Sequence, residues 1–237
     1  MMISKILVLL IVIYLILVIR YIHRTSSQIE IIQLPEAGFY QEEWNKSIKS
    51  RNPIIFFLDN SENLITKLDD IKFSKSLIKC ENLEGTVSLP GTLFKQLCTD
   101  NQKLDTVYVK KPSLQIESVF SPYVSLFSSK KIIGGNGHCF IFPKNVNTTI
   151  KTHNLFLYWW QTDGISQVIL FPPTSKNKSI LKKNKNTLWN NFDTFHGTTY
   201  LEVKLSPLQV LVIPPHWYYT TRIISTSVVY QITSLHF

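Results

Sequence analysis

The sequence predicts a mainly β domain, of closed-barrel or jelly-roll type, behind a single apolar N-terminal helix. The first 24 residues are dominated by Ile, Leu and Val, whereas after residue 105 short apolar and aromatic segments alternate with turn residues. We predict strands in eight of these segments: 105–111, 130–135, 137–143, 155–161, 166–173, 198–205, 209–215 and 226–235.

The region between the apolar segment and these strands mixes helix and strand. Residues 36–50 have helical spacing, 52–60 contain a short apolar strand between turn residues, and 88–101 are predicted to form a short helix that starts near a Pro-Gly pair. No second linker or repeat divides the rest of the chain. We therefore predict an anchor at 1–24 and one domain at 25–237, long enough to bury a core without disulfides.

The apolar run Ile6–Ile19 lies between Lys5 and Arg20. As a helix it covers about 21 Å, so it matches a hydrocarbon core of about 30 Å only with its flanking residues and with snorkelling of both basic side chains. We predict an uncleaved transmembrane helix over residues 3–22. The alternatives are a cleaved signal peptide, whose apolar core has this length, and a buried core helix; Arg20 and Arg24 stand where a small-residue cleavage site would be expected.

The orientation of the predicted anchor depends on few charges. Lys5 precedes the run and Arg20 and Arg24 follow it, which favours a single-pass protein with a cytoplasmic domain. Three glycosylation triplets would be usable only on the luminal side. They begin at Asn45, Asn147 and Asn177. Such triplets arise by chance in a chain so rich in asparagine.

The net charge of +9 makes nucleic acid a candidate partner. However, only four of the 25 basic residues are arginine and the chain has one alanine, a pattern typical of an AT-rich genome. Five lysines between Lys176 and Lys185 form one local cluster, which we predict to be a solvated loop or, alternatively, a patch for anionic lipid headgroups. The three cysteines form no CxxC pair and are predicted to be buried thiols: Cys80, Cys98 and Cys139.

Two segments carry a resemblance to a known family. "QTDGISQVILFPP" and "LEVKLSPLQVLVIPPHWYY" resemble the glycine-turn and closing segments of the JmjC-like cupins, which are Fe(II)/2-oxoglutarate protein hydroxylases, and "NPIIFFLDN" and "KKIIGGNGHCF" fall in the order expected for that family. The resemblance covers about residues 30–237. It implies a double-stranded β-helix with flanking N-terminal helices. In active members, two histidines and one carboxylate bind iron on one side.

The positions that would carry this chemistry depart from the family pattern. The His-x-Asp/Glu triplet falls on Lys151-Thr152-His153, or on Pro143-Lys144-Asn145 when counted from the upstream glycines. The distal histidine falls on Tyr219, just after a Pro-Pro turn, and the 2-oxoglutarate lysine falls on Ser166. The family's Gly-Asp turn falls on Leu208-Gln209. The resemblance therefore implies a domain that has lost its iron and 2-oxoglutarate sites, and we expect no cofactor.

Two histidines remain as weak metal candidates, His153 and His216. If His153 points inward, alternation puts an apolar set beside it, which makes a pocket with one imidazole. That set is Leu155, Leu157, Trp159 and Gln161, of which only Gln161 is polar. His216 would reach the interior only through a bulge. Trp217 is expected to line the pocket or to fill the core with the other aromatics, whereas His138 beside Cys139 and His196 three residues after Asp193 are weaker sites.

These observations predict a membrane-anchored, non-catalytic cupin-like protein that binds or scaffolds other molecules. Its partners would be the membrane, through residues 3–22, and a protein or a small apolar ligand. The alternative is an Fe(II)/2-oxoglutarate oxygenase with a metal site rearranged around His153 and His216. Nucleic-acid binding rests on charge alone and is the weakest prediction.

Overall fold

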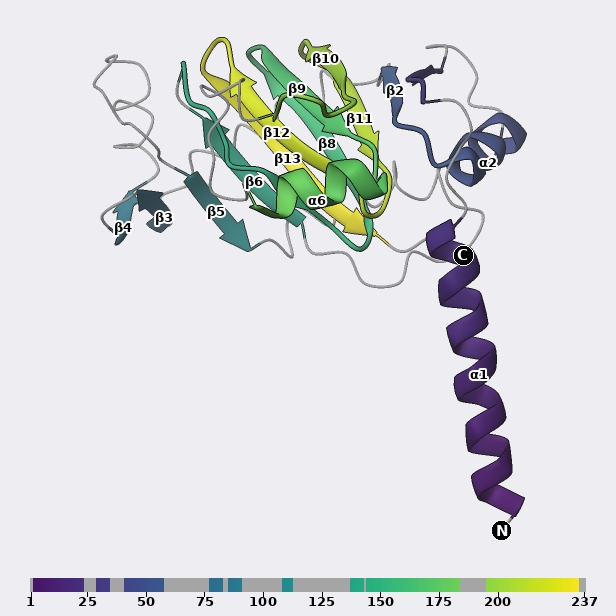
Figure 1. Ribbon diagram of the computed structural model, residues 1–237. Helices are drawn as coiled ribbons and strands as arrows, with labels where there is room; N and C mark the ends of the chain where they lie inside the picture. Colours follow the sequence, from purple (N-terminus) through teal and green to yellow (C-terminus); the bar gives the residue numbers. More distant parts are fainter. Residues whose placement is uncertain are drawn as a thin grey trace.

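The computed structural model describes residues 2–23, 29–34, 41–57, 77–82, 85–90, 108–112, 137–142, 144–183 and 195–234. This part of the chain is mainly β, as predicted, with strands β1–β13 in two sheets and the helices α1, α2 and α6 (Figure 1).

The larger sheet has nine strands. Every neighbouring pair in it is antiparallel except β1 and β2, which are parallel. In order across the sheet the strands are β1 (Ile32–Gln33), β2 (Ile54–Phe57), β11 (Gln209–Ile213), β8 (Phe156–Asp163), β13 (Ser227–Ser234), β6 (Gly137–Phe142), β5 (Tyr108–Pro112), β3 (Leu77–Asn82) and β4 (Gly85–Pro90).

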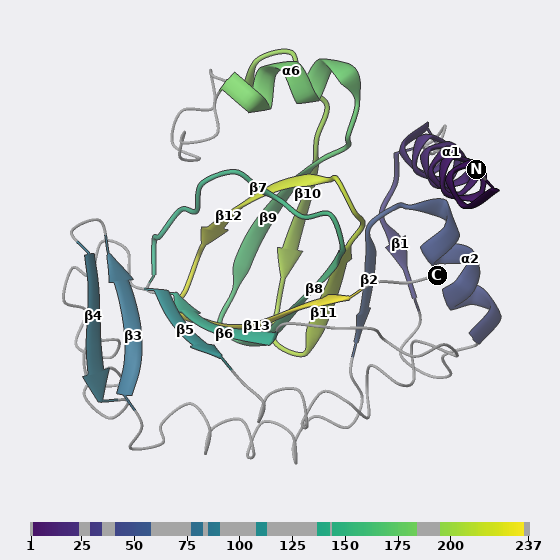
Figure 2. The same cartoon turned by 90° about the horizontal axis from the view of Figure 1, so that it is seen from below.

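The smaller sheet has four antiparallel strands and faces the middle of the larger one (Figure 2). Its strands, in order, are β10 (Leu201–Leu205), β9 (Ser166–Phe171), β12 (Tyr218–Ile223) and β7 (Lys151–Thr152). Inward-pointing side chains of both sheets, including Leu157, Leu170 and Leu211, form the main core between them. The two facing sheets together are here called the barrel, and this core is its interior. A ligand could bind inside the barrel only where the core side chains leave space.

One helix packs on the outer face of each sheet. In α2 (Gln41–Ser50) the buried Trp44 contacts Phe56 and Tyr158 of the larger sheet, at ring-centroid distances of 6.0 and 6.4 Å. In α6 (Ser175–Lys183) Leu181 is fully buried in a cluster with Phe171 and other residues of the smaller sheet. Coverage on both sides explains why β8 reads as a continuous apolar run rather than as an alternating strand.

The helix α1 (Met2–His23) extends away from the β domain (Figure 1). Its side chains are described for Ile6–Ile16, and all eleven of these are exposed and hydrophobic. Over the described residues, no helix is long and apolar enough to cross a membrane.

The prediction of a solvated loop in the lysine-rich segment after Thr174 is corrected by the structure, because this segment contains the helix α6. The Thr174 hydroxyl accepts a hydrogen bond from the Asn177 backbone N–H (3.2 Å), which is an N-cap. The buried Asn177 side-chain amide donates to the carbonyls of Pro172 (3.0 Å) and Thr199 (2.9 Å) and so fastens the helix to the domain.

The N-terminal half contains a second correction. The helix predicted at 88–101 is wrong at its start, since β4 continues to Pro90 and pairs with β3. The rest of that prediction, the strand at 130–135 and Cys98 lie outside the described residues.

Candidate functional site

The pairing of β12 with β7 brings two of the four predicted site positions together, Tyr219 and His153. Tyr219 lies opposite Lys151 in this pairing, and Lys151 is two residues before His153 in the chain. The Tyr219 hydroxyl and His153 Nε2 share a hydrogen bond of 2.8 Å, and their rings lie nearly parallel with centroids 5.7 Å apart. Burial raises the pKa of the Tyr219 phenol well above its ordinary value, so this side chain stays neutral at physiological pH.

A continuous series of aromatic rings leads from this pair across the barrel. Tyr219 meets Trp159 edge to face at 6.1 Å, Trp159 stacks on Phe142 at 6.1 Å, and Phe142 stacks on Phe140 at 5.6 Å. The Lys151 ammonium lies 5.9 Å from the centre of the Phe140 ring, at the end of the series. Lys151, at the position that the resemblance gives to the first ligand, thus makes a cation–π contact with Phe140.

Ser166 belongs to a polar network at the Gly164 turn, which meets the aromatic series at Trp159. Its hydroxyl donates to Gln161 Oε1 at 2.6 Å, and the Trp159 indole N–H donates more weakly to the same oxygen at 3.4 Å. The Gln161 Nε2 donates to the Asp163 carbonyl at 2.6 Å. Because Ser166 and Gln161 are completely buried and bonded to each other, neither presents a free group to a 2-oxoglutarate carboxylate.

The predicted pocket-lining residues are therefore packed in the core. Leu157, Trp159 and Trp217 belong to the main hydrophobic cluster, each with 3 % or less of its surface exposed. The Trp217 indole N–H donates to the Arg51 carbonyl at 3.1 Å and ties the end of α2 to the turn before β12. These side chains fill the core between the sheets, so they do not line an open pocket for an apolar ligand.

His216 stands in that turn in a left-handed conformation, with φ of 68°. Its backbone N–H donates to the His153 carbonyl at 2.8 Å. Burial, followed by the positive charges of Lys178 and Arg51, lowers the pKa of His216. Two cations close to this imidazole make it a poor ligand for a divalent metal.

The residues present do not fit an iron facial triad. His153 Nε2 is hydrogen-bonded to the neutral Tyr219 hydroxyl. Asp163 is exposed and accepts a hydrogen bond from the Gly164 N–H at 2.7 Å. Among the described residues, no three His, Cys, Asp or Glu side chains lie close enough together to hold a metal. His196 is exposed after Phe195, while the side chains of His138, Cys139 and Cys80 lie outside the described ones.

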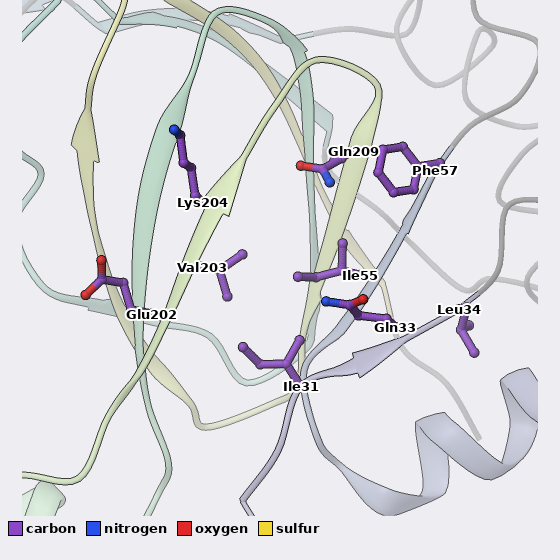
Figure 3. A pocket seen from close by; sticks show the side chains of 9 residues that line it. All are labelled: Ile31, Gln33, Leu34, Ile55, Phe57, Glu202, Val203, Lys204 and Gln209. Atoms are coloured by element: carbon purple, nitrogen blue, oxygen red, sulfur yellow. The ribbon is translucent and has the colours of Figure 1, made fainter.

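Two concave regions lie outside the barrel core. A pocket of about 320 Å³ opens between the edge strand β10 and the strands β1 and β2 (Figure 3). Its lining mixes apolar and polar side chains: Ile31, Gln33, Leu34, Ile55, Phe57, Glu202, Val203, Lys204 and Gln209. A second pocket, of about 290 Å³, lies at the β7 end of the barrel and is lined by Ile150, Lys151, Thr152, His153 and Tyr218.

No protein-family model matches the sequence, and no curated protein matches it.

Sequence reasoning missed part of the site. Phe140 and Phe142 complete the aromatic series, and their i, i+2 spacing within a strand is a signal for one shared face. Arg51 and Lys178 carry no such signal, because they come together with His216 only through the packing of α2 and α6 around the barrel.

Proposed function

We propose that this chain is a membrane-attached, non-catalytic binding or scaffolding protein whose domain has the double-stranded β-helix fold of the JmjC-like cupins. One observation carries the proposal. The position expected for the distal iron ligand holds the buried Tyr219, and its hydroxyl is hydrogen-bonded to His153.

The strand order supports the fold assignment. From β6 to β13, the strands β6, β8, β11 and β13 belong to the larger sheet and the strands β7, β9, β10 and β12 to the smaller one. A jelly roll has two sheets of this kind, with antiparallel strands that pass between them. Leu208 adds a local sign: it falls where the family has glycine, and its φ of 72° is a conformation that favours glycine.

The packing supports loss of catalysis. A tyrosine must lose its proton to bind iron, a histidine must keep a lone pair available, and an active site must keep open coordination positions. Here the phenol of Tyr219 is neutral and bonded, Ser166 is bonded to Gln161, and aromatic rings fill the interior. The oxygenase alternative would require His153 to leave Tyr219 and the His216 ring to leave its two cationic neighbours.

Metal and co-substrate binding test this proposal directly. The full chain in detergent, purified without chelator, is supplied with Fe(II) under anaerobic conditions, and bound iron and the melting temperature are measured with and without 2-oxoglutarate. We expect no stoichiometric iron and no stabilisation by 2-oxoglutarate. About one iron per chain, with a further rise in melting temperature, would overturn the proposal. In that case the iron must vanish in His153→Ala and persist in His196→Ala, because His196 is exposed.

Membrane attachment is proposed from the surface of α1. The side chains from Ile6 to Ile16 are each at least 44 % exposed, although every one is apolar or aromatic. A contiguous apolar surface of this size on a soluble protein usually marks an interface. The apolar residues occupy all sides of the helix, so lipid, which surrounds a helix completely, is the partner that would cover them.

Charge substitution in α1 is expected to release the protein from membranes. A charged side chain is costly in the apolar part of a bilayer, so Leu10→Arg with Ile11→Arg should move the full chain out of the membrane fraction after an alkaline wash. Leu10→Ala with Ile11→Ala is the control and should stay in that fraction. Equal sedimentation of the arginine and alanine variants, or wild-type protein in the washed supernatant, would contradict the proposal.

A further inference from the structure

We infer that the groove between β10 and β1 binds an extended peptide of a partner protein as an added strand. The inference rests on the proposed binding function and deepens it, because it names a surface and a class of partner. The groove is the pocket of about 320 Å³ that opens between the two sheets (Figure 3). It lies where β10 ends the smaller sheet and β1 ends the larger one.

The outer edge of β10 carries backbone groups that no described strand pairs with. The Ile224 N–H donates to the Ile165 carbonyl at 2.9 Å, on the β12 side of β9. Backbone groups alternate between the two edges of a strand, so the odd-numbered residues of β9 bond to β12 and the even-numbered ones bond to β10. The partners of the even-numbered residues include Val203. The N–H and C=O groups of Glu202 and Lys204 therefore point away from β9.

The strand β1 presents a second free edge to the groove. The N–H groups of Ile32 and Leu34 donate toward β2, at 2.9 and 3.0 Å, so the backbone groups of the residues between and before them point the other way. Among the described strands, none pairs with β1 on that side. A strand placed in the groove could thus form hydrogen bonds along both of its edges. The residues whose backbone groups point outward from the two edges all line the groove: Ile31, Gln33, Glu202 and Lys204.

The two free edges favour a peptide over a second copy of this chain. In a second copy, β10 would still be paired with β9 along one edge, and β1 would still be paired with β2. Each of these strands therefore has one edge to offer, whereas the groove presents two. The occupant that matches both edges is an extended segment with no strand partner of its own.

The apolar side chains of the groove define half of the peptide's pattern. Val203 points into the barrel core. Ile55 and Phe57 share the inner face of β2, because they are two residues apart in a strand, yet Phe57 is 41 % exposed. The smaller sheet thus leaves this end of the inner face uncovered. Apolar side chains pointing inward from an added strand would cover it.

Glu202 and Lys204 define the other half of the pattern, because both side chains are exposed on the outer face of the sheet. The Glu202 carboxylate accepts a hydrogen bond from the Gln167 side-chain amide, which is neutral and leaves the carboxylate its charge. In an antiparallel pairing, which continues the smaller sheet, residues directly opposite each other lie on the same face. An acidic residue would lie opposite Lys204 and a basic one opposite Glu202. The expected partner therefore reads acidic, apolar, basic from its N-terminus, with apolar residues on either side.

Peptide binding to the full chain in uncharged detergent tests the inference. The probe is a fluorescein-labelled Thr-Val-Glu-Val-Lys-Val-Thr peptide, followed by fluorescence anisotropy with empty micelles as the blank. We expect saturable binding, about tenfold tighter than that of Thr-Val-Lys-Val-Glu-Val-Thr, which would place like charges opposite each other. A probe that is N-methylated at its Glu and Lys lacks the N–H groups that would face β10 and should not bind.

Exchange of the two charges in the chain is the matched control. Glu202→Lys with Lys204→Glu keeps the composition and the backbone edge, so it should invert the preference between the two peptides. The melting temperature should change little, since both side chains are exposed. The inference would be overturned by no saturable binding, by an unchanged preference in this variant, by binding of the N-methylated probe, or by a dimer of the full chain that Glu202→Lys dissociates. None of these results changes the amount of bound iron, which tests the proposed function separately.

Discussion

Alanine in place of Gly164 is expected to lower the free energy of unfolding by about 3–5 kcal/mol. Gly164 makes the turn between β8 and β9 with φ of 72°, where an L residue is already strained. A Cβ there would overlap the Thr226 carbonyl oxygen and lie 2.8 Å from the Ser227 Cα. Both obstacles are backbone atoms at the start of β13, so the turn can accept the methyl group only if two strands shift. Thermal or urea unfolding of the full chain measures the loss.

Gly197→Ala is the matched control for this prediction. Gly197 also has a positive φ, 83°, but a Cβ there would meet only the end of the flexible Lys176 side chain, at 3.6 Å. We expect a loss of about 1–2 kcal/mol from backbone strain alone. Equal losses in the two variants would mean that the close approach at Gly164 has no energetic consequence, contrary to the argument from the Thr226 and Ser227 backbone.

The sequence predicts the central strands well because local signals bound them. The strands β9 and β11 each run into a Pro-Pro pair, Gly164 follows β8, and the predicted and observed limits of these strands agree within two residues. In contrast α6 has few apolar residues, and its helix depends on the buried Leu181 and on the Thr174 cap. The two-residue strand β7 is too short for any periodicity and exists only because β12 pairs with it.

The candidate site is predictable in position but not in content. The resemblance assigns Tyr219 and His153 to two ligand positions of the family, and in the structure the two side chains share a hydrogen bond. It does not indicate that Lys151 turns to Phe140, or that Ser166 is bonded to Gln161, because these contacts depend on side-chain packing across several strands. The approach of Arg51 and Lys178 to His216 depends on tertiary packing still more, since Arg51 precedes the other two residues by more than a hundred positions in the chain.

Truncation of Tyr219 is the second substitution with a large expected effect. Tyr219→Ala removes a ring that is only 1 % exposed and contacts Trp159 and His153, which should cost about 3–5 kcal/mol of unfolding free energy. At roughly 2–4 °C per kcal/mol for a chain of this size, the melting temperature should fall by about 10 °C. The new cavity would have the shape of a phenol, so p-cresol should raise the melting temperature of the variant but not that of the wild type.

Tyr200→Ala provides the control because it makes the same chemical change on the surface. Tyr200 is 40 % exposed and its ring lies 6.2 Å from Phe171, so its loss should cost no more than about 1 kcal/mol, with no rescue by p-cresol. A small effect of Tyr219→Ala, or failure of p-cresol to stabilise that variant, would count against a tightly filled barrel. Rescue of Tyr219→Ala by p-cresol would mean that the interior has the form of a ligand site that is filled by a side chain of the protein itself. Because that site is filled, we expect this domain to bind its partners on its outer surface.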